Sequence, residues 1–238
     1  METPVLEGTI AKRTLHFFWI VDCSGSMEGK KIASMNQAIR EAIPEIRKVV
    51  SAHPEVQIMM RAIQFSDKAS WLIGPDAVPI ESFIWTDVTA HSETATAKAI
   101  KMLASELEIE KMSRRGYPPV CILLSDGFCT DPEEEYEAAI QQLNGLPWGR
   151  KAVRLVIAIG NENEYDEEQL LKFVSHQEIG VLHADTPEKL TEYIKWASVS
   201  ASVGASVGKS KANGGDNNQN VVLPSPPVVT TADQTDVF

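Results

Sequence analysis

Three short and nearly continuous apolar runs constrain the fold of this chain more than any other feature of its sequence. They occupy residues 15–21 (LHFFWIV), 120–124 (VCILL) and 153–159 (VRLVIAI). Such runs lack the polar alternation of a half-exposed strand and are typical of strands buried on both faces of a parallel sheet. They are also far shorter than the roughly 20 residues of a membrane-spanning helix. We therefore expect a buried sheet and no membrane span.

Stretches with helical periodicity separate the apolar runs. Over residues 30–51 apolar side chains recur at spacings of three and four, and Pro44 is expected to bend this helix. Alternating strands and helices predict the α/β class: a doubly wound, mostly parallel open sheet with helices on both faces, which binds ligands beyond the carboxyl ends of its strands. The remaining predicted elements are helices at 96–112, 132–143, 166–175 and 187–197, a strand pair at 55–65 and 70–74, and a last strand at 180–183.

Composition divides the chain into three parts. We expect residues 1–11 to form an N-terminal arm and residues 12–197 to form one folded domain. Residues 198–238 contain a single aromatic residue, Phe238, and are rich in Ser, Gly, Asn, Pro and Val. A segment of this composition buries too little apolar surface to offset its ordering entropy, which predicts a flexible, low-complexity tail. The alternative is a partner-binding tail that uses residues 221–229 (VVLPSPPVV).

Charge and cysteine content limit the kinds of partner and the cell compartment that we expect. The formal net charge is -11, and phosphates are bound mainly by Lys and Arg, so we expect no nucleic-acid partner. Three cysteines without CxxC or Cys/His finger spacing predict reduced thiols and no structural zinc site. The first residues also lack the apolar segment of a signal peptide. These features predict a cytoplasmic protein.

A cluster of oxygen-bearing side chains follows the first apolar run. Asp22, Ser24 and Ser26 alternate in the motif DCSGSM, so in an extended turn their oxygens can converge on one point beyond the strand. Oxygen ligands suit a hard cation such as Mg²⁺, which keeps some of its waters and needs few carboxylates. The alternative interpretation is structural, with an aspartate that ends a strand and serines that cap the next helix.

Two further segments bring oxygen donors to the same place. Asp126 ends the second apolar run in the motif LLSDG, and Thr94 precedes a predicted helix. In a doubly wound sheet the first and fourth strands are neighbours where the strand order reverses, so we expect Asp126 beside Asp22. With these three motifs in this order, the chain resembles a von Willebrand factor A domain with a metal-ion-dependent adhesion site over residues 12–197.

The resemblance implies that one divalent cation binds here, usually Mg²⁺, with Mn²⁺ and Ca²⁺ as alternatives. It also implies binding rather than turnover, because the cation accepts an Asp or Glu carboxylate from a protein partner. The chain departs from the family in the loop before the threonine, where Ser92 and Glu93 replace the paired glycines that the family usually has. The residues that match the ligands of the family are Asp22, Ser24, Ser26, Thr94 and Asp126.

A narrower resemblance is to the bacterial TerY-like branch, named for tellurite resistance. It rests on DCSGSM, Trp85, LLSDG and the closing LTEYIKWASVSAS. It implies an adaptor or regulator in stress or defence signalling, with a Ser/Thr kinase or a PP2C-type phosphatase as partner.

Acidic residues are expected to form a rim around the metal, which would favour a basic partner. The alternative is that they only satisfy helix N-termini. The expected rim residues are Glu93, Glu133, Glu134 and Glu135.

An enzyme is the alternative function. The same oxygen cluster can hold a water-activating cation in a metal-dependent hydrolase or phosphatase, although such sites usually carry more carboxylates or histidines. The segment GSMEGK is not a phosphate loop, because Lys31 stands where Ser or Thr is required. Of the five histidines, only His91 is expected near the site, and a serine nucleophile needs a base. We therefore expect a binding module and not an enzyme.

Overall fold

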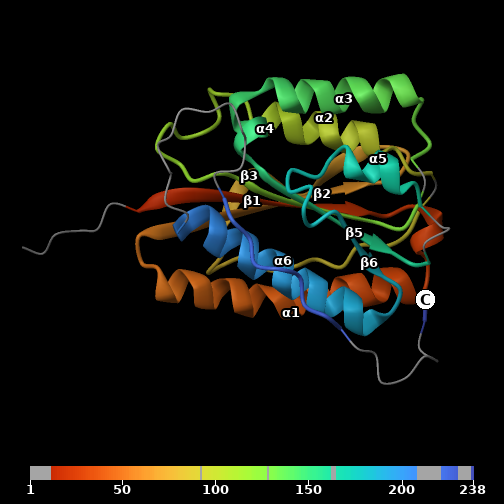
Figure 1. Cartoon of the computed structure of the whole chain (residues 1–238), viewed down its shortest axis with the longest axis horizontal. Coiled ribbons are helices and arrows are strands. Elements are labelled where there is room, and N and C mark those ends of the chain that lie inside the picture. Colours follow the sequence, from red (N-terminus) through yellow and green to blue (C-terminus); the bar gives the residue numbers. More distant parts are fainter. Residues whose placement is uncertain (1–11, 92, 128, 162–164, 208–220, 230–236) are drawn as a thin grey trace, which may run out of the picture.

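The computed structural model describes residues 12–91, 93–127, 129–161, 165–207, 221–229 and 237–238. Their centre is a six-stranded sheet with the order β3-β2-β1-β4-β5-β6, in which every neighbouring pair is parallel except β2 and β3 (Figure 1). This confirms the predicted α/β class. The strands are β1 (Arg13–Asp22), β2 (Val56–Phe65), β3 (Ala69–Pro79), β4 (Val120–Ser125), β5 (Val153–Ile159) and β6 (Val181–Ala184).

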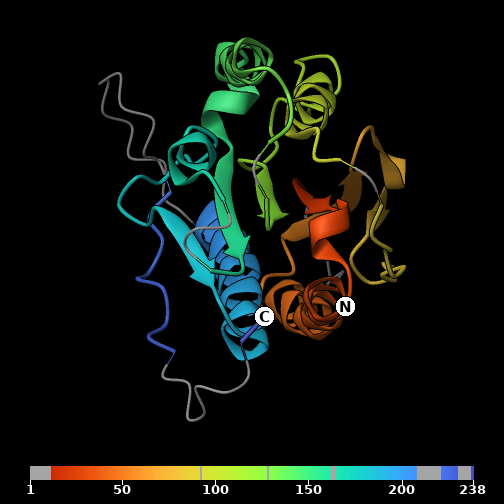
Figure 2. The same cartoon turned by 90° about the vertical axis from the view of Figure 1, so that its right-hand side faces the viewer.

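Helices cover both faces of the sheet, as Figure 2 shows from the end at which the parallel strands terminate. The long helices α1 (Lys30–Ala52) and α6 (Pro187–Val207) pack against each other on one face. On the described residues, no helix has the length and apolarity to cross a membrane. The other face carries α2 (Thr96–Glu106), α3 (Glu133–Gly145), α4 (Pro147–Lys151) and α5 (Glu167–Leu171), and a short 3-10 turn, η1 (Gly25–Met27), joins β1 to α1.

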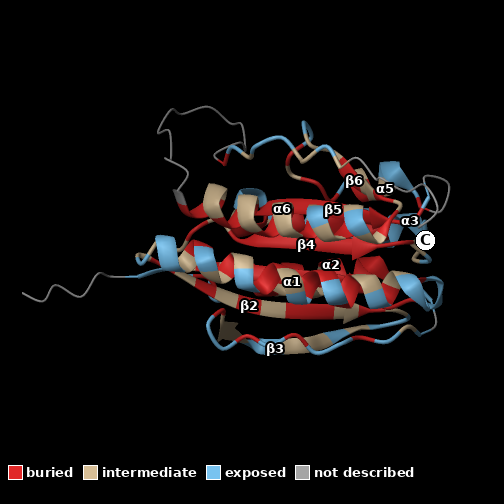
Figure 3. Ribbon diagram, turned by 90° about the horizontal axis from the view of Figure 1, so that it is seen from below, coloured by how far each residue is buried: buried red, intermediate tan, exposed pale blue. Residues whose placement is uncertain are grey.

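Two apolar layers explain why the central strands read as continuous apolar runs. In β1, Phe17 and Trp19 belong to the core beneath α1 and α6, whereas Phe18 and Ile20 belong to the core beneath α2 and α3. Successive side chains of a strand point to opposite faces, so a strand covered on both sides needs apolar residues at every position. Figure 3 shows β4 and β5 buried along their length, in contrast to the more exposed edge strand β3.

Several predicted boundaries are wrong. The helix α1 is not among them, because it contains Pro44 as expected and ends at Ala52, one residue beyond the expected 51. The helix α2 ends at Glu106 instead of 112, because the chain turns after it in a way that buries both Leu107 and Met112. The strand β3 is longer than expected, α5 is shorter, and α4 is not predicted by the sequence pattern.

The largest difference lies at the end of the domain, where α6 runs ten residues beyond the expected end at 197. Ala197, Ala201 and Ala205 are fully or almost fully buried. Their spacing of four puts them on one face of the helix, where small side chains allow close packing. The segment that reads as low complexity from residue 198 is therefore, up to Val207, part of a helix with one face buried against the domain.

Part of the expected tail also packs on the domain. Val221 is 6% exposed and joins the core, and its carbonyl oxygen accepts a hydrogen bond from His176 Nε2 at 2.9 Å. Gly204 makes room for it, because a Cβ there would lie 2.9 Å from Val221 Cγ1. The backbone N–H of Phe238 donates to the carbonyl of Asp185 at 3.1 Å. The expectation of a flexible tail therefore does not hold at Val221 and Leu223, which pack on the core, while residues 208–220 and 230–236 and the predicted arm 1–11 lie outside the described residues.

We expect Val221→Ala to lower the free energy of unfolding by about 1–2 kcal/mol, because it removes buried methyl groups and leaves a cavity. Val222→Ala is the matched control, since Val222 is 85% exposed and its truncation should change stability by less than about 0.5 kcal/mol. Urea denaturation of both variants measures the difference. Equal changes in unfolding free energy for the two variants would mean that the segment around Val221 is not part of the folded domain.

Candidate metal site at the carboxyl ends of the strands

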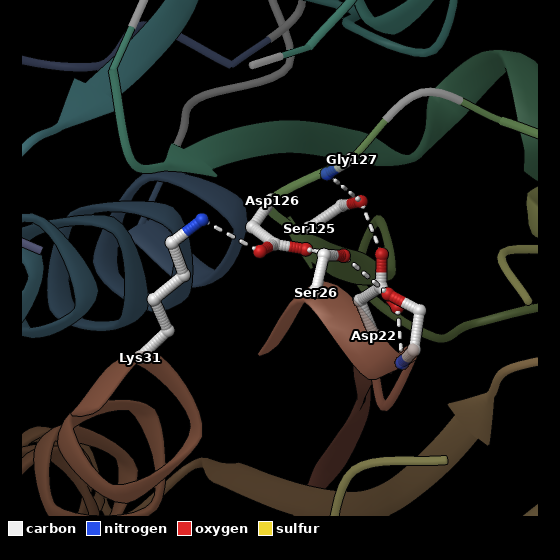
Figure 4. Close-up of polar contacts among 7 residues, drawn as sticks. Asp22, Ser26, Lys31, Ser125, Asp126 and Gly127 are labelled. Atoms are coloured by element: carbon white, nitrogen blue, oxygen red, sulfur yellow. Dashed lines mark hydrogen bonds and ion pairs between the residues drawn. The ribbon is translucent and has the colours of Figure 1, made fainter. Parts of the chain in front are cut away.

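The pairing of β1 with β4 creates the site. These strands are parallel neighbours in a register that pairs Val21 with Leu124, so Asp22 at the end of β1 lies beside Ser125 at the end of β4. The sequence predicted this neighbourhood correctly. The turn η1 then carries Ser26 back over the same strand ends (Figure 4).

A chain of hydrogen bonds joins these residues. Asp22 Oδ1 accepts from the backbone N–H of Ser24 at 2.8 Å, and Asp22 Oδ2 accepts from the hydroxyl of Ser125 at 2.5 Å. The hydroxyl oxygens of Ser24 and Ser26 are 3.0 Å apart, and the Ser26 hydroxyl donates to Asp126 Oδ1 at 2.7 Å. Four of the five predicted ligands are therefore within one connected cluster.

Thr94, the fifth predicted ligand, faces the same space. It is 5% exposed, and its carbonyl oxygen accepts from the N–H of Thr130 at 2.8 Å and from the Thr130 hydroxyl at 3.0 Å. A Cβ placed on Gly127 would lie 3.5 Å from Ser26 Oγ and 3.6 Å from Thr94 Oγ1. Both hydroxyls thus border the space beside Gly127. Thr94 reaches this space even though Glu93 stands before it in place of the glycine usual in the family. Glu93 itself is exposed, and Ser92 lies outside the described residues.

The electrostatics of the cluster favour a bound cation. Asp22 and Asp126 are 0% and 1% exposed. Burial raises the pKa of Asp22 from 3.8 to about 6, hydrogen bonds from Ser125 and Ser24 act in the opposite direction, and the carboxylate of Asp126 raises it further. One ammonium of the chain, that of Lys31, contacts Asp126, and further positive charge beside the two buried carboxylates would stabilise their ionised forms.

The donor set fits a hard divalent cation. It contains two carboxylates and three hydroxyls, which are oxygen ligands of the kind that Mg²⁺, Mn²⁺ and Ca²⁺ accept. Within the described part of the chain, no group of three or more His, Cys, Asp or Glu residues has a geometry that could hold a metal. A site built here therefore depends on the hydroxyl oxygens.

Lys31 is a member of the cluster that no sequence motif predicts. Its Nζ donates to Asp126 Oδ2 at 2.8 Å, and its side chain is 15% exposed. The sequence shows only that this lysine begins a helix shortly after DCSGSM. Its contact with a carboxylate 95 positions away depends on the packing of α1 against the strand ends.

The acidic residues of the expected rim are partly compensated by lysines of this chain. Glu133, Glu134 and Glu135 form the exposed first turn of α3. Glu135 lies 3.4 Å from the ammonium of Lys101, and Glu133 lies 3.8 Å from that of Lys172. Exposed pairs of this kind are weak and screened by salt. Their contribution to partner binding stays a prediction.

The structural alternative holds for two other acidic residues. Asp131 Oδ2 accepts from the N–H of Ala97 in the first turn of α2 at 2.7 Å, and Asp166 Oδ1 accepts from the N–H of Gln169 in α5 at 3.0 Å. Both carboxylates therefore cap helices. Two acidic positions shortly before α5, 162 and 164, lie outside the described residues.

His91 lies near the site, as expected, because its backbone N–H donates to the carbonyl of Cys23 at 2.6 Å. Its ring is exposed and lies 3.2 Å from the hydroxyl of Thr89. Cys23, which stands between Asp22 and Ser24, is buried in the core beneath α1.

Comparison with known proteins agrees with the fold. The family model of the von Willebrand factor type A domain matches residues 18–195. Among curated proteins, no sequence matches the chain.

Several solved structures have the same fold. The von Willebrand factor type A protein from Catenulispora acidiphila is 17% identical with a TM-score of 0.59, and the match covers 81% of this chain and 43% of that chain. The ArnB paralog VWA2 from Sulfolobus acidocaldarius is 19% identical with a TM-score of 0.56, covering 78% and 45%. Proximal thread matrix protein 1 from the mussel byssus, in a structure with a zinc-occupied MIDAS motif, is 16% identical with a TM-score of 0.54, covering 81% and 46%. The chain thus spans less than half the length of these proteins, and identities this low show the fold alone.

The raised pKa of Asp22 predicts how stability depends on pH when divalent cations are chelated. Its folded value of about 6 lies above the ordinary 3.8, so the folded state binds this proton more tightly. The unfolding free energy should therefore rise as pH falls from 7 through 6 and level off below 3.8. Asp22→Asn keeps the shape without the charge and should stabilise the chain by about 2–3 kcal/mol at pH 7 in EDTA.

Thermal or urea unfolding of both proteins from pH 7 to pH 4 checks this. The advantage of Asp22→Asn should shrink toward zero at the acidic end. A constant difference across this range would contradict the assignment of the titration to Asp22.

Proposed function

The chain belongs to the von Willebrand factor type A family, and from this premise we propose that it is a metal-dependent protein-interaction module. The observation that carries the proposal is the convergence of two buried carboxylates and three hydroxyls at the ends of β1 and β4. The residues proposed to hold the cation are Asp22, Ser24, Ser26, Thr94 and Asp126.

The chemistry of this donor set favours capture of a carboxylate. A divalent cation bound here supplies a positive centre to which an Asp or Glu side chain of a partner can be attracted. Three of the five protein donors are neutral hydroxyls, which reduce the positive charge of a bound cation less than carboxylates do. A bound cation would therefore still attract a carboxylate from outside the chain. The exposed glutamates of the α3 first turn, together with Glu93, are proposed to favour basic residues around the captured carboxylate.

Mg²⁺ is the proposed cation, with Mn²⁺ and Ca²⁺ as alternatives. Hydroxyl-rich oxygen sites with few carboxylates suit Mg²⁺, which keeps several of its waters. The mussel thread protein, with its zinc-occupied MIDAS motif, supports the idea that this fold accepts a divalent ion at such a motif.

The proposed cellular role is that of an adaptor in a bacterial TerY-like stress or defence system. A Ser/Thr kinase or a PP2C-type phosphatase is the proposed partner, and the cytoplasm is the proposed compartment. Support comes from the sequence motifs that this branch shares. The structure gives one of them a packing role: Trp85 is 6% exposed, and its indole N–H donates to Asn36 Oδ1 at 2.9 Å, which ties the loop before Thr94 to α1.

We expect Ser26→Ala to weaken Mg²⁺ binding by about tenfold or more, because it removes a donor oxygen and a hydrogen bond that positions Asp126. Ser51→Ala is the matched control, since that hydroxyl contacts the Arg47 carbonyl in the last turn of α1. Isothermal titration with Mg²⁺ measures both variants. Retention of partner proteins on the immobilised chain, with Mg²⁺ and with EDTA, should follow the same order.

Two results would contradict the proposal. Ser26→Ala could bind Mg²⁺ and partners as the unmodified chain does, in which case the cluster is structural. Alternatively, the purified chain could hydrolyse phosphate esters in Mg²⁺ or Mn²⁺ in a way that Asp22→Ala abolishes, which would favour the metal-dependent phosphatase.

A further inference from the structure

We propose that Lys31 is the internal counter-ion of the metal site: its ammonium neutralises Asp126 while no divalent cation is bound, and it must leave Asp126 when one binds. Lys31 would thereby determine how tightly the site holds its metal. This inference rests on the proposed function, because it assumes that a divalent cation binds at the cluster.

Both oxygens of Asp126 are already engaged. Oδ1 accepts the hydroxyl of Ser26 at 2.7 Å, and Oδ2 accepts the ammonium of Lys31 at 2.8 Å. The close-up shows the two partners approaching from opposite sides, with Ser26 from η1 and Lys31 from the start of α1 (Figure 4). A cation that uses the charge of Asp126 therefore competes with an ammonium ion already in place.

The ion pair is shielded from water on the carboxylate side. The side chain of Asp126 is 0% exposed and that of Lys31 is 15% exposed. Among the ion pairs between described residues, none other involves Asp126 or Asp22. Charges in a partly buried site interact more strongly than at a free surface. Removal of the Lys31 charge should therefore increase the attraction of the whole cluster for a divalent cation.

The position of Lys31 in its helix favours a switch over a permanent ion pair. Lys31 lies in the first turn of α1, which contains no acidic residue. A cation at a helix N-terminus is unfavourable because the helix dipole is positive there. The contact with Asp126 offsets that cost, and a bound divalent cation would restore it by displacing the ammonium. Metal affinity should therefore be lower than the oxygen donors alone would provide.

Lys30 offers a matched control. It is the neighbouring residue with the same charge, its Nζ donates to the carbonyl of Val237 at 3.1 Å, and among the described residues it pairs with neither Asp22 nor Asp126. Lys31→Gln and Lys30→Gln change the net charge equally. Only the first removes the counter-ion of Asp126.

The test is isothermal titration with Mg²⁺ of the full chain and both variants. Lys31→Gln should bind Mg²⁺ about tenfold more tightly, which is about 1.4 kcal/mol, and Lys30→Gln should change the affinity less than about twofold. In EDTA, Lys31→Gln should also unfold at a lower temperature than the unmodified chain, and saturating Mg²⁺ should remove that difference. In an Asp126→Asn background, Lys31→Gln should give little further gain.

The outcomes separate this inference from the function on which it rests. If all three proteins bind Mg²⁺ with equal affinity, the site stands and the role of Lys31 is overturned. Equal tightening by Lys30→Gln and Lys31→Gln overturns it as well, because the effect is then one of net charge. If neither the unmodified chain nor Lys31→Gln binds Mg²⁺, Mn²⁺ or Ca²⁺, the proposed function fails. Binding by Lys31→Gln alone supports the inference.

Discussion

The parallel pairing of β1 with β4 is the constraint on which the rest of this structure depends. It joins segments about a hundred positions apart and places the hydroxyl of Ser125 2.5 Å from Asp22. Apolar layers on both faces hold the register, since a shift by one residue would exchange the faces of Phe17 and Phe18. The polar residues at the strand ends therefore meet because the apolar residues behind them cannot slide.

The cost of this arrangement is two buried carboxylates side by side. Burial raises the pKa of Asp22 to about 6, so positive charge close to the two carboxylates stabilises the folded chain. Lys31 supplies one such charge from within the chain, and a divalent cation would supply more. The fold tolerates this electrostatic cost because its stability comes from the two apolar cores, which lie along the strands and not at their ends.

The sheet, and the residues that it brings together in the candidate site, could largely be predicted from the sequence. Continuous apolar runs indicate buried parallel strands, and a general rule of doubly wound sheets brings Asp22 and Asp126 together. Lys31 could not be predicted, because its contact depends on the packing of α1 against the strand ends. The last ten residues of α6 and the burial of Val221 could not be predicted for a related reason. Small residues and short apolar pairs resemble a low-complexity sequence, and only the surface that they pack against shows that they are buried.

The most direct test of the account is a crystal structure of the chain grown with Mn²⁺, with anomalous diffraction used to locate the metal. The account predicts one strong anomalous peak enclosed by Asp22, Ser24, Ser26, Thr94 and Asp126, with the ammonium of Lys31 withdrawn from Asp126. A map with no peak at these residues, and with Lys31 still paired to Asp126 at saturating Mn²⁺, would contradict it.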